Sequence, residues 1–183
     1  MTPDSEIRLE NVCLNPTRIG FLKVLERMGA QVFFEIKEKT PDLMGSIHVK
    51  GKKLRGTRIT HEEIPALIDE IPILMIAMAG AEGESLISGA SELRVKETDR
   101  IHSMVTNLKA IGAEAEELPD GCLIRGVKEF QGAVVKSFGD HRTAMSFAIA
   151  SLRSKHEIEI QDTACIATSF PGFFKEFNRL RKL

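Results

Sequence analysis

A repeated order of helix and strand patterns limits the fold of this chain more than any other feature. Helix, two short strands, helix and strand follow one another from residue 18 to residue 88 and again from residue 99 to residue 160. Met28-Gly29-Ala30 of the first copy matches Ile111-Gly112-Ala113 of the second. A unit of this size buries its apolar face only against a neighbouring copy. The sequence therefore predicts a compact α+β lobe with parallel helices inside and short sheets outside.

Hydrophobic periodicity places the elements of each copy. Alternation predicts strands, and turn residues separate them, at 7–12, 32–36, 47–50, 85–88, 114–118, 122–125 and 157–160. We expect Thr17 to cap the first helix and Gly29 to end it. The near-continuous apolar run that follows Pro72 predicts a helix enclosed on most sides.

Two further helices are predicted in the second half. Asp140 is expected to cap a helix that has Ala144, Met145, Ala148, Ile149 and Leu152 on one face. The last helix is expected to begin at 169–171, with Phe174, Phe177 and Leu180 facing inward. It resembles the start of a third copy.

Charge and composition exclude several classes of function. With 25 Lys plus Arg against 26 Asp plus Glu, the net charge is -1, and Tyr and Trp are absent, so we expect no nucleic-acid partner. Cys13, Cys122 and Cys165 are far apart, which predicts no metal site and small buried thiols in a reducing cytosol. The run 71–81 is too short to span a bilayer, and residues 1–6 are polar, so a cytoplasmic protein without a membrane partner is expected.

The charged segment from Leu93 to Ile101 is the first candidate for a functional site. Lys96, Glu97, Asp99 and Arg100 precede a helical apolar stripe. A helix start carries unpaired N–H groups and partial positive charge, so an arginine there suits a site for an anionic ligand. The alternative is a solvated helix start in which Asp99 or Glu97 merely compensates Arg100.

Packing the two copies side by side would gather the amino-terminal ends of the helices. The charged residues brought to that end are Arg18, Asp69, Lys96, Glu97, Arg100, His141 and Arg142. Such a surface suits phosphate or carboxylate, and Asp69 and Glu97 are placed to move protons. Each has a plainer interpretation: Asp69 complementing a helix dipole, His141 making a local hydrogen bond, and Arg142 pairing with Asp140 alone.

The charged motifs also resemble those of a known family. Residues 93–100 together with 140–147 closely resemble the signature segments of the 5-enolpyruvylshikimate-3-phosphate (EPSP) synthases. Residues 68–72 and 167–171 match as well, so the resemblance covers nearly the whole chain. It implies two lobes, each built from three βαβαββ units, and identifies residues 1–183 as a single carboxy-terminal lobe without its amino-terminal partner.

The resemblance further implies transfer of an enolpyruvyl group from phosphoenolpyruvate to the 5-hydroxyl of shikimate 3-phosphate, by addition and then elimination of phosphate. Asp69 would contact the shikimate hydroxyls and accept the 5-hydroxyl proton, and Glu97 would exchange a proton with the methylene carbon. Lys96 would help to hold shikimate 3-phosphate, while Arg100 and Arg142 would hold phosphoenolpyruvate. No metal or cofactor is implied.

His141 would orient this site by hydrogen bonding. The family's other lobe supplies further lysine, serine, glutamine and arginine ligands, so this chain alone is expected to be inactive. Residues 15–18, Glu92 and Thr168 resemble the glyphosate-tolerant bacterial subgroup, whereas many members carry asparagine and lysine at the last two positions. Two alternatives are a lobe of the UDP-N-acetylglucosamine enolpyruvyl transferase and a non-enzymatic binding lobe of the same fold.

Overall fold

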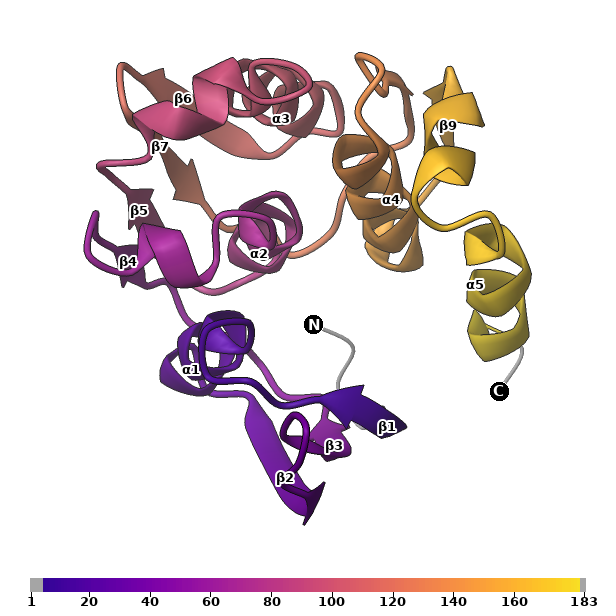
Figure 1. Cartoon of the computed structure of the whole chain (residues 1–183). Coiled ribbons are helices and arrows are strands. Elements are labelled where there is room, and N and C mark those ends of the chain that lie inside the picture. The colour runs from indigo at the N-terminus through magenta and orange to yellow at the C-terminus, as the bar shows by residue number, and fades with distance from the viewer. Residues whose placement is uncertain (1–4, 182–183) are drawn as a thin grey trace.

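The computed structural model describes residues 5–181, which form interior helices flanked by three small sheets, with the last helix on the outside (Figure 1). The first half contains β1 (Glu6–Cys13), α1 (Gly20–Arg27), β2 (Gln31–Glu38), β3 (Met44–Lys50), β4 (Arg58–Ile59), α2 (Ile71–Ala79) and β5 (Glu84–Ile87). The second half contains α3 (Arg100–Ala110), β6 (Glu114–Leu118), β7 (Gly121–Arg125), β8 (Ala133–Lys136), α4 (His141–Ala150), β9 (Ile158–Gln161) and α5 (Phe173–Arg181). Short 3-10 helices precede α2, α3 and α5 and follow α4.

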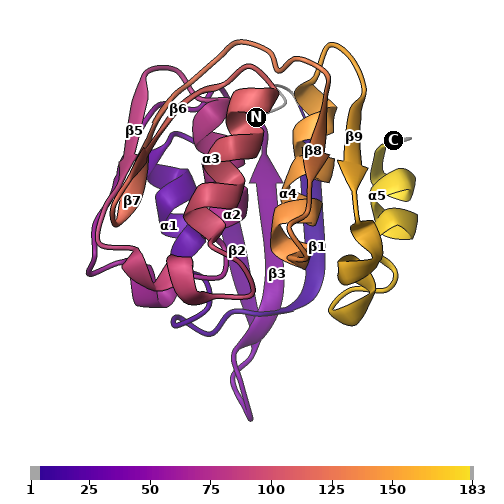
Figure 2. The same ribbon diagram turned by 90° about the horizontal axis from the view of Figure 1, so that it is seen from above.

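Helices α2, α3 and α4 lie side by side in the interior and run roughly parallel (Figure 2). Every residue of α2 except Ile73 is buried, which confirms the helix predicted after Pro72. A helix that is apolar on all sides has to be covered on all sides. Helices α3 and α4 and strand β7 contact α2, and the sheets lie outside these helices, as the sequence predicts.

The sheet topology confirms the internal repeat. In each unit an antiparallel hairpin, β2–β3 or β6–β7, follows the first helix. A parallel pair of strands, β4–β5 or β8–β9, then brackets the second helix. Gly29 and Gly112 end α1 and α3 at φ values of +101° and +81°, a conformation that glycine adopts without strain. A 3-10 helix and α5 follow β9 just as a 3-10 helix and α3 follow β5, so a third copy does begin there.

Two of three apolar clusters hold the inner layers together, and the third packs α4 against Ile166 and Phe173. The larger lies between α2, α3, α4 and the sheet β4–β5–β7–β6, and the smaller packs α1 against the sheet β1–β3–β2 through Leu14, Leu22, Val32 and Ile47. Of the three cysteines only Cys122, on β7, is buried, and burial raises the pKa of its thiol to about 12. The expectation of three buried thiols is wrong, because Cys13 is exposed on β1 and Cys165 is partly exposed.

The start of α1 differs from the prediction. The helix begins at Gly20, and no side chain caps it. The side-chain oxygen of Asn15 instead accepts hydrogen bonds from the backbone N–H (3.0 Å) and the hydroxyl (2.8 Å) of Thr17. This Asx-type turn uses the hydroxyl that the sequence had assigned to the helix cap.

Other boundaries also shift. The leading residues of the charged segment belong to a 3-10 helix (Ser91–Val95), and β8 was not predicted because four residues give too short an alternation. Helix α5 begins at Phe173, later than expected, and buries that residue, whereas Phe174 and Leu180 are exposed and Phe177 is partly buried. The inward face predicted for this helix is therefore wrong for Phe174 and Leu180. Among residues 5–181 no helix is both long and apolar enough to cross a membrane.

Candidate functional site

Charged residues from the amino-terminal ends of α2, α3 and α4 converge at one end of the interior helices. Asp69 lies two residues before α2, Arg100 is the first residue of α3, and Arg142 is the second residue of α4. The Asp69 carboxylate is 3.5 Å from Nη1 of Arg100 and 3.2 Å from Nη2 of Arg142. The predicted gathering of helix ends is confirmed for these three residues.

Arg100 forms the centre of the cluster, although its side chain is only 2% exposed. Its Nε donates to Oδ2 of Asp140 at 2.6 Å, and its Nη2 donates to Glu97 at 2.6 Å. A buried guanidinium requires such partners, because an isolated charge in the interior is strongly destabilising. Of the two partners proposed in the plainer interpretation, Glu97 does pair with Arg100.

Asp99, the other proposed partner, is used elsewhere. Its side chain caps α3 by accepting from the backbone N–H of His102 at 2.9 Å, and it pairs with Arg94 at 2.7 Å. Arg94 also donates to Glu117 and to the carbonyl oxygens of Leu118 and Pro119. This network fastens the charged segment to the β6–β7 hairpin.

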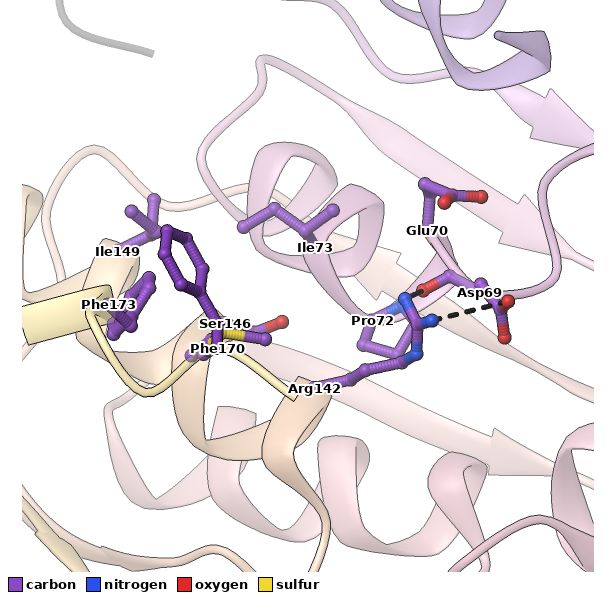
Figure 3. Close-up of a pocket in the computed structure, with 10 residues that line it drawn as sticks. Asp69, Glu70, Pro72, Ile73, Arg142, Ser146, Ile149, Phe170 and Phe173 are labelled. Atoms are coloured by element: carbon purple, nitrogen blue, oxygen red, sulfur yellow. Dashed lines mark hydrogen bonds and ion pairs between the residues drawn. The ribbon is translucent and has the colours of Figure 1, made fainter. Parts of the chain in front are cut away.

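Arg142 approaches the cluster from α4. Its Nη1 donates to the backbone carbonyl of Asp69 at 2.8 Å, and its Nη2 pairs with the Asp69 carboxylate (Figure 3). The backbone N–H of Arg142 donates to Oδ1 of Asp140 at 2.6 Å. A pairing of the Arg142 side chain with Asp140 alone is therefore wrong, since the side chain binds Asp69. Asp69 itself does more than complement a helix dipole, because two arginines hold its carboxylate.

The remaining predicted residues lie around this cluster. Arg18, with a side chain that is 62% exposed, reaches the Asp69 carboxylate only at 4.0 Å. Lys96 pairs with Glu92 at 2.9 Å rather than with the central acids. His141 begins α4 and is partly exposed, and within residues 5–181 its imidazole makes no hydrogen bond. The role predicted for His141 stays a prediction.

A pocket of about 230 Å³ opens beside Arg142 and Asp69 (Figure 3). Ile73 of α2, Ile149 of α4 and the rings of Phe170 and Phe173 contribute apolar walls. Glu70 stands at its edge, where burial raises the pKa of the carboxyl and the nearby charge of Arg142 partly opposes that shift. The charged cluster thus adjoins an apolar hollow between α2, α4 and the start of α5.

This arrangement is suited to binding anions and moving protons. Two guanidinium groups point their terminal nitrogens toward the same carboxylate, and such forks match carboxylate and phosphate groups. Glu97 is 51% exposed, so an anion can displace it from Arg100 without unfolding the site. Within residues 5–181 no group of three or more acidic, cysteine or histidine side chains is placed to hold a metal ion.

The sequence indicated Asp140 only as a helix cap and did not reveal its contact with Arg100. A cap aspartate next to the site, followed at once by His141 and Arg142, was the available signal. The position of Arg94 was also visible in the sequence, but three of its bonds join the segment to a hairpin that lies 23 to 25 residues away. No local pattern reports such a contact.

Comparison with known structures defines the class of protein first. The enolpyruvyl transferase NikO from Streptomyces tendae has the same fold, with a TM-score of 0.74 over 97% of this chain at 18% identity. An EPSP synthase from Acinetobacter baumannii is closer, with a TM-score of 0.93 at 40% identity over 97% of this chain and 42% of its own. The fold is thus that of the enolpyruvyl transferases.

Sequence comparison then identifies the family. The model of the EPSP synthase (3-phosphoshikimate 1-carboxyvinyltransferase) family matches residues 1–177, and the chain belongs to that family. A 3-phosphoshikimate 1-carboxyvinyltransferase from Sulfurihydrogenibium sp. is 45% identical over 97% of this chain. Another from Nitratiruptor sp. is 48% identical over the whole of it. The chain spans only 42% and 41% of the lengths of these two relatives.

Proposed function

We propose that residues 1–183 form the carboxy-terminal lobe of a 3-phosphoshikimate 1-carboxyvinyltransferase. The reaction transfers the enolpyruvyl group of phosphoenolpyruvate to the 5-hydroxyl of shikimate 3-phosphate and releases phosphate. The convergence of Asp69, Glu97, Arg100 and Arg142 at one end of three helices carries this proposal, because the reaction needs both anion binding and proton transfer. The family match supports the choice of substrates.

Two carboxylates take the proton-transfer roles. Asp69 is held by arginines while its side chain stays 28% exposed, so a substrate hydroxyl can approach the carboxylate and give up its proton. Glu97 lies on the more exposed side of Arg100 and is assigned the exchange of a proton with the methylene carbon. A proton on carbon moves only to a group placed within direct reach, and a carboxyl on a short, exposed segment meets that requirement.

The cations take the binding roles. Arg100 and Arg142 bind phosphoenolpyruvate, since each presents a guanidinium fork at the cluster. Lys96 contributes to binding shikimate 3-phosphate after leaving Glu92, a surface pair that costs little to break. His141 orients the bound ligands through a hydrogen bond made only when they are present.

The proposal includes an amino-terminal lobe as a required partner. The chain matches about two fifths of each relative, and the remaining phosphate ligands are assigned to the rest of the enzyme. A location in the cytoplasm belongs to the same proposal, supported by three free cysteines. The resemblance to glyphosate-tolerant members at 15–18, Glu92 and Thr168 stays a prediction, testable as inhibition of the assembled enzyme by that compound.

Release of phosphate from both substrates tests the proposal. We expect no release by this chain alone, and release after addition of the separately produced part of the Sulfurihydrogenibium relative that this chain does not match. Glu97→Gln should abolish the signal of the mixture. Activity of the chain alone would overturn its assignment as a half site, and an inactive mixture would count against the proposed reaction.

The same mixture separates the competing functions. UDP-N-acetylglucosamine as acceptor should give no phosphate release, whereas turnover with it would assign the chain to the sibling enzyme. Binding of RNA with a steep dependence on salt would instead support a binding lobe.

A further inference from the structure

We propose that Asp140 is a positioning residue that holds both anion-binding arginines in place with a single carboxylate. The inference rests on the proposed function only in naming the ligand, phosphoenolpyruvate. It follows from the juxtaposition of the Asp140 carboxylate with the Arg100 side chain and the Arg142 backbone.

The contact with Arg100 uses the inner edge of the guanidinium. Oδ2 of Asp140 accepts from Nε at 2.6 Å, and the two side chains are 0% and 2% exposed. Nη1 and Nη2 then point outward, where Asp69 and Glu97 contact them at 3.5 Å and 2.6 Å. These two nitrogens form the edge that binds a carboxylate or phosphate in two places. Asp140 therefore holds Arg100 without occupying the nitrogens that a ligand would use.

The contact with Arg142 uses the other oxygen. Oδ1 of Asp140 accepts from the backbone N–H of Arg142 at 2.6 Å and from that of Thr143 at 3.3 Å. One rigid carboxylate thus sets the position of the Arg142 backbone relative to the Arg100 side chain. A fixed separation of the two guanidinium groups strengthens binding of a ligand that they share. If either group is misplaced, its contact with the ligand weakens and the ligand shifts relative to the other group.

A line of buried polar residues along α3 supports the same role. Below Arg100, the Ser103 hydroxyl lies 3.4 Å from the Thr143 hydroxyl. Further along, the Asn107 side chain donates to the carbonyl of Lys136 at 2.7 Å and accepts from its N–H at 3.2 Å. These directional hydrogen bonds fix the position of α3 against α4 and β8, whereas apolar contacts tolerate sliding. Asp140 stands at the end of this line that faces the site.

Removal of the carboxylate should alter the site in a specific way. Arg100 would keep only Glu97 and Asp69 as partners, and its side chain would move toward them. Its terminal nitrogens would then no longer face a ligand. Ligand affinity should accordingly fall by more than the loss of a helix cap explains.

Two variants and a matched control test this role in the chain as it is. Asp140→Ser keeps a hydroxyl that can cap α4 but removes the contact with Arg100. Asp140→Asn keeps the shape and removes the charge. Asp99→Asn is the control, since Asp99 also caps a helix and pairs with an arginine, Arg94, but contacts neither Arg100 nor Arg142.

The first readout is hydrogen exchange of the Arg100 Nε–H, measured by NMR without ligand. Protection of this proton in the unaltered chain is expected, and rapid exchange there would overturn the proposal even if both Asp140 variants failed to fold. Both variants should accelerate the exchange at least tenfold, whereas Asp99→Asn should leave it unchanged. Unchanged exchange in Asp140→Ser would also overturn the proposal.

The second readout is the affinity for phosphoenolpyruvate, measured by titration of the same samples. Asp140→Ser and Asp140→Asn should weaken binding at least tenfold, and Asp99→Asn by less than twofold. Equal weakening in all three variants would show that general stability, not positioning, matters. If the unaltered chain binds no phosphoenolpyruvate, binding requires the ligands assigned to the other lobe, while the exchange measurement still decides the role of Asp140.

Discussion

The two repeated units place an arginine near the start of their first helix and an aspartate near the start of their second, yet the two pairs differ. In the first unit Arg18 and Asp69 stand 4.0 Å apart, and their side chains are 62% and 28% exposed. In the second unit Arg100 and Asp140 are 2.6 Å apart and almost wholly buried. The same positions in the repeat thus provide an open ion pair and a closed one.

The difference follows from where each first helix begins. Helix α1 starts at Gly20, beyond the turn that Asn15 closes, so Arg18 lies outside it and reaches toward solvent. Arg100 is instead the first residue of α3 and packs against α4. The open pair leaves the Asp69 side chain 28% exposed, whereas the closed pair fastens the start of α3 to the start of α4.

Breaking the closed pair should have the largest effect. Arg100→Met leaves the Asp140 carboxylate buried without its partner, and we expect the free energy of unfolding to fall by about 3–5 kcal/mol. Arg18→Met removes only an exposed, distant contact and should change it by less than about 0.5 kcal/mol. Urea unfolding of both variants provides the measurement.

A double variant sharpens that result. Arg100→Met combined with Asp140→Leu removes both buried charges, so part of the lost stability should return. A double variant less stable than Arg100→Met alone would show that the cap made by Asp140 matters more than its charge.

Loosening the charged segment should have an intermediate effect. Arg94 binds two acids and two backbone carbonyls, and Arg94→Ala should lower the free energy of unfolding by about 1.5–3 kcal/mol. Because Asp99 then loses a partner, hydrogen exchange at the backbone N–H of His102 should accelerate. Unchanged exchange at His102 would contradict the idea that this network fastens the second unit.

The smallest expected difference between the two units is in how the free energy of unfolding depends on pH. Burial raises the pKa of Glu70 in the first unit above its ordinary value, so ionised Glu70 disfavours folding. The contribution of Glu70 to the free energy of unfolding is fully present below the unfolded pKa of about 4.5. It is lost as pH rises through the higher folded pKa. Glu70→Gln should stabilise the chain at pH 7 by less than about 1 kcal/mol and lose this advantage near pH 4.

Asp99 in the second unit should behave in the opposite way. Burial would raise its pKa, but hydrogen bonds from the His102 N–H and from Arg94, with the charge of Arg94, outweigh it and lower the pKa. Its contribution is therefore present above the unfolded pKa of 3.8 and is lost as pH falls through the folded value. Asp99→Asn should destabilise the chain at pH 7 by less than about 1 kcal/mol, and the difference should be smaller at pH 3. Urea unfolding midpoints of both variants at low pH and at pH 7 provide the measurement. A change of stability at pH 7 with the same sign for Glu70→Gln and Asp99→Asn would contradict this contrast.

Much of the fold was predictable because it follows from periodic patterns. The repeat, the apolar helix after Pro72 and the cap at Asp140 all have local signals of the kind that sequence displays. The gathering of Asp69, Glu97, Arg100 and Arg142 then followed from the parallel packing of the units. The resemblance to a known family supplied the roles of these residues, which no spacing reveals.

The features that were not predicted depend on contacts between distant segments. Burial of Arg100 requires Asp140, which lies 40 residues away, and the exposure of Phe174 depends on how α5 packs. At Thr17 the error was local, since two polar residues competed for the same turn and Asn15 prevailed. Short strands such as β8 are defined by their partner, not by their own sequence.

The unequal exposure of the three thiols means that they should react with a thiol reagent at different rates. A reagent that attacks thiolates would modify Cys13 early, because its side chain is accessible in the folded protein. Cys122, on the central strand β7, would wait until that sheet parts from its neighbours. The rate at which Cys122 is modified, compared with that of Cys13, thus reports how often the sheet opens, and no probe has to be introduced.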